Sequence, residues 1–135
     1  MKKFTKLLAL SLMFVCMSIS NETKAQSILM TGWDTVVNTA SVSATYRATG
    51  KPTYVAIQNV LTKISGTVAG KSYLYASLDG ITYVAIDSMT ATNQTTNAKI
   101  WIVANPKAYA YYKVTHTGSG TMSAILAPKI IIREY

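Results

Sequence analysis

The stretch that decides the fold is residues 72–88, SYLYASLDGITYVAIDS. Two runs in which apolar residues alternate with small or polar ones flank Asp79-Gly80. An Asp-Gly pair between two such runs is among the strongest signals for a β-hairpin, because glycine adopts a positive φ at little cost. The sequence therefore predicts two antiparallel strands on either side of this pair.

The same strand-like pattern continues outward in both directions from the hairpin. Threonine, serine, tyrosine and β-branched residues dominate after Gln26, in short runs that recur about every 8–12 residues. Further strands are expected at residues 36–48, 53–65, 99–104, 109–117, 121–126 and 129–134. About seven strands at this spacing predict an all-β chain, a single antiparallel β-sandwich. Immunoglobulin-like and jelly-roll-like strand orders both stay open.

The N-terminus has the pattern of a secretory signal peptide. Lysines at positions 2, 3 and 6 precede a short apolar run, and a small residue, Ala25, follows a polar stretch. We expect cleavage between Ala25 and Gln26, which leaves a β-sandwich domain of residues 26–135. The single cysteine, Cys16, leaves with the signal peptide, so the domain is expected to fold without a disulfide. The predicted localisation is secreted or at the cell surface.

Composition excludes several classes of protein. Half of the residues are hydrophobic (50%) and 13% are charged, a balance that excludes an intrinsically disordered chain. No apolar run reaches the ~18 residues of a membrane span, so no integral membrane segment is expected after the signal is removed. Residues 1–25 carry three of the eight net positive charges, and residues 26–135 keep +5. Their nine basic residues are evenly spaced along the sequence, which argues against a nucleic-acid partner.

The residues that carry enzyme chemistry are scarce. After residue 25 the chain has one histidine, His116, and four carboxylic acids: Asp34, Asp79, Asp87 and Glu134. No metal-ligand spacing, no nucleophile elbow and no phosphate loop is present. We therefore predict no catalytic residues, no metal site, no cofactor and no enzymatic activity.

Tyrosines supply one candidate binding surface. Alternation places Tyr73 and Tyr75 on one face of a strand with Tyr83 on its hairpin partner, and Tyr109 and Tyr111 on one face of another strand. Such rings serve either as cross-strand packing or as an exposed aromatic platform for glycans or a partner subunit.

The C-terminal strand supplies a second candidate, a surface for assembly. Ile130, Ile131 and Ile132 place apolar side chains on both faces of a last strand that ends at Tyr135. A free terminal strand of this kind invites pairing with another chain. An ordinary buried last strand is the alternative.

Residues 60–126 resemble a known group of proteins. The turn Ser65-Gly66-Thr67-Val68-Ala69-Gly70 followed by the Asp79-Gly80 hairpin is similar to a pattern in small exported or virion-associated β-sandwich structural proteins of Bacteroidetes and their phages. Asn105-Pro106 and Gly118-Ser119-Gly120-Thr121 fit the same pattern. The resemblance implies a structural role without catalysis, at a cell surface or in a phage virion.

Together these observations predict a non-catalytic structural building block. Its expected partners are copies of itself or a surface or virion scaffold protein, through the C-terminal strand or the tyrosine faces. The alternative function is a secreted carbohydrate-binding module that uses the exposed tyrosines.

The signal peptide is testable by mass. Protein released by cells that express the full-length sequence should have the intact mass of residues 26–135, because signal peptidase cuts after a small residue such as Ala25. Intact-mass spectrometry measures this directly, and a bulky Ala25→Tyr variant should remain uncut. Released wild-type protein that still carries residues 1–25 would contradict the prediction.

Overall fold

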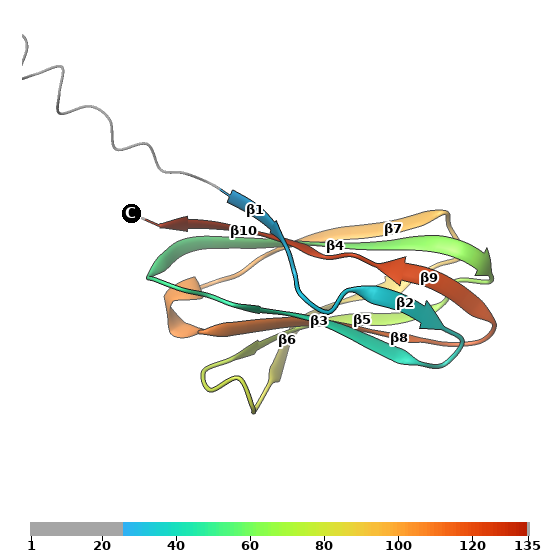
Figure 1. Ribbon diagram of the computed structural model, residues 1–135, viewed down its shortest axis with the longest axis horizontal. Helices are drawn as coiled ribbons and strands as arrows, with labels where there is room; N and C mark the ends of the chain where they lie inside the picture. The colour runs from blue at the N-terminus through green and yellow to red at the C-terminus, as the bar shows by residue number, and fades with distance from the viewer. Residues whose placement is uncertain (1–25, 135) are drawn as a thin grey trace, which may run out of the picture.

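The computed structural model describes residues 26–134, which form two stacked antiparallel β-sheets (Figure 1). The strands are β1 (Gln26–Leu29), β2 (Asp34–Val37), β3 (Ser41–Arg47), β4 (Pro52–Gly66), β5 (Gly70–Ser77), β6 (Val84–Ala91), β7 (Thr96–Ile102), β8 (Tyr111–Gly118), β9 (Met122–Leu126) and β10 (Lys129–Glu134), with a short 3-10 helix, η1 (Pro106–Ala108), before β8. The predicted all-β sandwich is confirmed, with ten strands within residues 26–134 where about seven were expected. The described part of the chain has no helix long and apolar enough to cross a membrane. The signal peptide proposed for residues 1–25 lies outside the described residues.

The strands are nested around the β5–β6 connection. β5 pairs with β6, β4 with β7, β3 with β8, β2 with β9 and β1 with β10, all antiparallel. The chain is thus one long double strand that is rolled up so that β10 and β9 pair with β4, and β8 pairs with β5. This nesting is a jelly roll, one of the two strand orders that the sequence leaves open.

The rolled-up double strand forms two sheets, each from a different set of strands. Sheet A contains β1, β2, β4, β7, β9 and β10, and sheet B has the order β3-β8-β5-β6. Alternate residues of each strand point between the sheets. On β4, alternation places Val55, Ile57, Asn59 and Leu61 on one side of the strand, and all four are fully buried; Trp101 of β7 is buried opposite them. One apolar layer therefore forms the core.

The first predicted strand, residues 36–48, is wrong in one respect. A turn at Asn38, whose φ is 53°, divides it into β2 and β3. β2 belongs to sheet A and β3 to sheet B, so the chain changes sheets at this turn. On β3, Val42, Ala44 and Tyr46 share the inward side: Ala44 is buried, and Val42 and Tyr46 pack against the core.

The C-terminal strand is an ordinary paired strand, the second of the two possibilities that its sequence leaves open. β10 pairs with β1 on one side and with β4 on the other, so both of its edges are hydrogen-bonded. The sequence pattern could not reveal this, because β4 lies more than 60 residues earlier in the chain and β1 more than 90. Tyr135 lies outside the described residues.

Asp79 organises the connection between β5 and β6. Its Oδ1 accepts hydrogen bonds from the backbone N–H groups of Ile81 and Thr82, both at 2.8 Å, and from the Ser77 hydroxyl, also at 2.8 Å. The hairpin is confirmed, but its loop spans residues 78–83 instead of the two residues expected. The loop is wider because the Asp79 carboxylate accepts hydrogen bonds from groups on both sides of it. These hydrogen bonds lower the pKa of Asp79 to about 2. Gly80 follows with a φ of 76° and packs against the Tyr111 ring.

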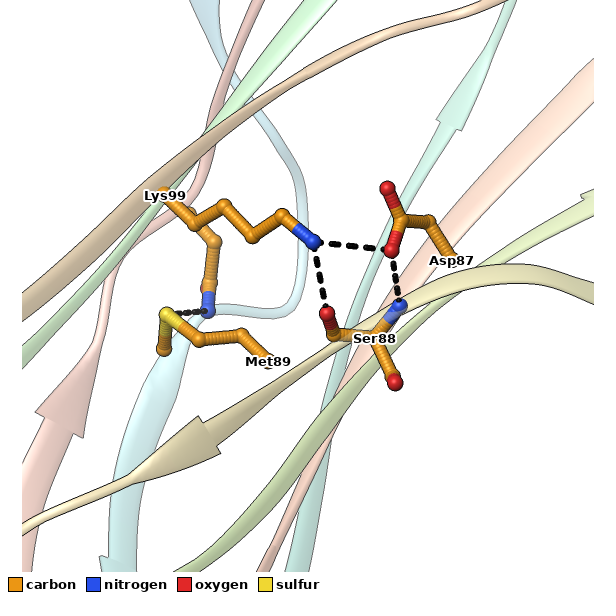
Figure 2. Close-up of polar contacts among 5 residues, drawn as sticks. Asp87, Ser88, Met89 and Lys99 are labelled. Atoms are coloured by element: carbon orange, nitrogen blue, oxygen red, sulfur yellow. Dashed lines mark hydrogen bonds and ion pairs between the residues drawn. The ribbon is translucent and has the colours of Figure 1, made fainter.

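A polar seam closes the sandwich where β6 and β7, from opposite sheets, run past each other (Figure 2). The Lys99 ammonium donates to Asp87 Oδ1 and to the Ser88 carbonyl oxygen, both at 2.8 Å. The bond from Lys99 is the main cause that lowers the pKa of Asp87. Because Lys99 and Asp87 are partly exposed, the ion pair adds little stability.

The Asp79 turn gives a testable prediction. Asp79→Ala should lower the melting temperature at pH 7, because three donors lose their acceptor. The folded pKa of about 2 lies below the ordinary value of 3.8, so the carboxylate stabilises the fold above pH 3.8 and loses that effect as the pH falls toward 2.

Thermal unfolding of both proteins between pH 7 and pH 2 measures this difference. Asp34→Ala is the matched control, because the Asp34 carboxylate accepts one bond, from its own neighbour Thr35. An equal loss of melting temperature in the two variants would count against the role of Asp79.

Candidate functional site

The candidate site residues lie on the two outer faces of the sandwich. Each strand gives one side of its alternating residues to the shared core, so the other side faces outward. The outer face of sheet A is mainly apolar, and the outer face of sheet B is aromatic and basic. The two faces look away from each other because the sheets are stacked (Figure 1).

The isoleucine face is the outer face of sheet A around Ala56, Val60, Ile100, Ile102 and Ile131. Ile102 of β7, Ala56 of β4 and Ile131 of β10 are register partners and form a row across three strands. Ile100 stands two residues from Ile102 on the same side of β7. The exposed fractions are 62% for Ile100 and 69% for Ile102, which is unusual for isoleucine.

The row next to this one is more polar. Gln58 pairs with Ile100 on one side and with Lys129 on the other. Gln58 stands between Ala56 and Val60 on the same side of β4, so the isoleucine face contains a polar side chain within it. Ile100 and Ile102 were not among the predicted site residues, although alternation around the buried Trp101 places both of them outward.

The three C-terminal isoleucines are divided between the core and the surface. Ile130 is fully buried, Ile132 packs partly against the core, and Ile131 points outward with 36% of its surface exposed. Only Ile131 of the predicted assembly residues therefore contributes to the isoleucine face.

The tyrosine face is the outer face of sheet B that carries Tyr73, Tyr75, Tyr83 and Tyr111. Four of the five predicted tyrosines come together here, because β5 and β8 are neighbours and Tyr83 comes just before β6. All four rings are partly buried. The Tyr73 and Tyr75 rings are 5.9 Å apart between centroids and tilted by 41°, so they do not form a flat platform.

Three cations lie over these rings. Lys113 places its ammonium 4.0 Å from the Tyr83 centroid and 5.1 Å from that of Tyr75. Lys71 lies 5.0 Å from the centroid of Tyr73, and the Arg47 guanidinium lies 5.7 Å from that of Tyr111. Each contact is a cation–π interaction, which holds the cation near the ring. Even spacing along the sequence thus hides a basic cluster that forms when β3, β8 and β5 pair.

Hydroxyl groups complete the tyrosine face on β3 and β8. Ser41 and Thr117 share a hydrogen bond of 2.7 Å, and Ser43 and Thr115 share one of 2.8 Å. Thr115 is also the register partner of Tyr73. The face therefore places hydrogen-bonding groups directly beside aromatic rings.

Tyr109 does not belong to the tyrosine face. β8 begins only at Tyr111, because η1 and Ala110 occupy the preceding positions, so the expected alternation from residue 109 is wrong. The Tyr109 ring instead meets the buried Tyr112 edge-on, with centroids 6.3 Å apart. Tyr109 also lines three hollows at this end of the sandwich, of about 340, 270 and 170 Å³.

The one histidine of the described residues lies inside the core. His116 is fully buried, and its Nδ1 is 2.9 Å from the hydroxyl oxygen of Ser72, which is also fully buried. The burial of His116 lowers its pKa. Because the Ser72–His116 pair is sealed from solvent, a substrate cannot reach it. Within residues 26–134 no three His, Cys, Asp or Glu side chains gather as a metal site.

Comparison with known proteins identifies the fold and no family. No protein-family model matches the sequence, and no curated protein matches it.

Solved structures with the same fold include three from distant sources. Dimeric latent PorU from Porphyromonas gingivalis is 6% identical, with a TM-score of 0.54 over 83% of this chain and 13% of PorU. A chain of infectious bursal disease virus, Gx strain, is 10% identical, with a TM-score of 0.52 over 86% of this chain and 33% of the viral chain. The mitogen of Yersinia pseudotuberculosis is 9% identical, with a TM-score of 0.51 over 84% of this chain and 87% of the mitogen. At these identities the likeness concerns the fold alone.

Burial of His116 predicts a loss of stability in mild acid. The unfolded chain binds a proton near pH 6.5, while the folded chain resists protonation, so the free energy of unfolding should fall as the pH drops below 6.5. The expected slope approaches about 1.4 kcal/mol per pH unit until the folded pKa is reached. Urea unfolding at pH 7.5 and pH 5 measures it, and His116→Gln should flatten the slope. An unchanged slope in that variant would show that other groups cause the loss.

Proposed function

We propose that this chain is an exported or virion-associated, non-catalytic building block that assembles with copies of itself through the isoleucine face. The observation that carries the proposal is the row of Ile102, Ala56 and Ile131, with Ile100 beside it. Burial of a large isoleucine surface is favourable at about 25 cal/mol per Å². A face of this kind is stable in water mainly when something covers it.

A second copy is the occupant that the face fits best. Two sheets pack face to face about 10 Å apart, as sheets A and B do within this molecule. The same face on two copies forms a self-complementary, two-fold contact, the commonest arrangement of protein dimers.

Face packing is favoured over pairing at the β7 edge. β7 pairs with β4, and Lys99 on β7 points into the seam toward Asp87. An inward-pointing charge on an edge strand discourages pairing with another chain. The isoleucines therefore act through their side chains and the sheet face, not through backbone hydrogen bonds.

The N-terminal pattern and the sequence resemblance support the location. A basic start, an apolar run and Ala25 fit export, and residues 60–126 resemble structural sandwich proteins of Bacteroidetes and their phages. A non-catalytic role agrees with His116, which is sealed inside the core.

Light scattering across a concentration series tests the assembly. Protein expressed from the full-length sequence should increase in mass with concentration, to a dimer or a larger assembly. The double variant Ile100→Thr/Ile102→Thr keeps β-branched residues on β7 and should weaken association at least about tenfold, because apolar area is lost on both copies.

The matched control is Leu78→Thr/Ile81→Thr. These side chains are 72% and 85% exposed in the loop between β5 and β6, so the variant removes similar apolar area away from the isoleucine face. Association should stay at the wild-type level in this control. A wild-type protein that stays monomeric throughout, or equal weakening in both double variants, would refute the proposal.

A further inference from the structure

We propose that the tyrosine face binds an anionic polysaccharide, whose sugar rings lie against Tyr73, Tyr75 and Tyr83 and whose acidic groups meet Lys113 and Lys71. This site lies on the opposite side of the sandwich from the isoleucine face. It therefore works independently of self-assembly.

Charge selects an anionic ligand. Lys71, Lys113 and Arg47 lie on one sheet face. None of the four carboxylic acids of residues 26–134 belongs to that face: Asp87 points into the seam toward Lys99, Asp79 folds into its turn, and Asp34 and Glu134 belong to sheet A. The face thus concentrates positive charge without internal neutralisation, which attracts and orients anions.

Aromatic rings beside the cations point to a polymer with apolar ring faces. Lys113 lies between Tyr75 and Tyr83, so a sugar unit against either ring has an ammonium within reach of its acidic group. The half-buried rings are held by the sheet and lose little freedom on binding. The hydroxyl pair of Ser43 and Thr115 adds hydrogen-bonding groups next to Tyr73.

The spacing of the cations bears on how a charged polymer lies on the tyrosine face. Lys113 is the register partner of Tyr75, four residues from Lys71 along β5. At ~3.3 Å per residue the two backbone positions are about 13 Å apart. Cations this far apart meet acidic groups on units that are not adjacent along a polymer.

Binding should be measured with a charged polymer and its neutral form. Protein expressed from the full-length sequence is titrated with polygalacturonate, and with the same polymer after full methyl esterification, by isothermal calorimetry at low and physiological salt. Polygalacturonate should bind, added salt should weaken the binding, and the ester should bind at least about fivefold more weakly. Equal binding of the two polymers would overturn the proposal.

Single substitutions locate the site. Lys113→Gln should weaken binding of polygalacturonate about fivefold, whereas Lys129→Gln on sheet A, which removes the same charge, should leave it unchanged. Tyr75→Leu should also weaken it, although the net charge stays constant. Each variant is first checked for wild-type melting temperature, and Lys71→Gln replaces any Lys113 variant that fails to fold.

Two results would refute the tyrosine face as this site. Equal losses in the Lys113 and Lys129 variants would mean that the polymer responds only to overall charge. Tighter binding of single-stranded oligothymidylate than of polygalacturonate would assign the face to nucleic acid.

Discussion

A single apolar layer between two sheets is the constraint on which the rest of this structure depends. Each strand can give only alternate residues to that layer, so half of every strand must face outward. In most sandwiches both outer faces are polar. Here one outer face carries Ile100, Ile102 and Ile131, and the other carries four tyrosines with three cations. The fold therefore presents two chemically different surfaces that cannot obstruct each other.

Nesting about the β5–β6 loop determines which residues meet on each surface. Because β4 is the longest strand, β10 and β9 pair along one of its edges and β7 pairs along the other, and this brings Ile102, Ala56 and Ile131 into one row. On sheet B the same nesting places β8 between β3 and β5, so Lys113 lies near both Tyr75 and Tyr83. The surfaces are products of topology, and no continuous segment of sequence contains either of them.

The local features of the fold could be predicted from the sequence, and the non-local ones could not. Alternation correctly places Val55, Ile57 and Leu61 in the core, and Asp79-Gly80 marks the central hairpin. The pairing of β10 on both edges depends on strands far away in the chain, so the sequence could not decide between a free and a paired C-terminal strand. The prediction for Tyr109 is wrong for a local reason: η1 precedes β8, and β8 begins two residues later than expected. Four of the five predicted tyrosines do lie together on the tyrosine face, because they belong to the β5–β6 hairpin or to β8.

Charge illustrates why spacing along the sequence is a weak guide to a surface. Arg47, Lys71 and Lys113 are separated by 24 and 42 residues, and this even spread argues against a basic cluster. Antiparallel pairing of β3, β8 and β5 brings these distant positions side by side, so all three cations lie on one face. The acidic residues Asp79 and Asp87 do not gather on that face. Their carboxylates accept hydrogen bonds within a turn and within the seam between β6 and β7, and these bonds stabilise the fold. Three of the basic residues thus gather on one sheet face, whereas Asp79 and Asp87 are engaged in hydrogen bonds elsewhere.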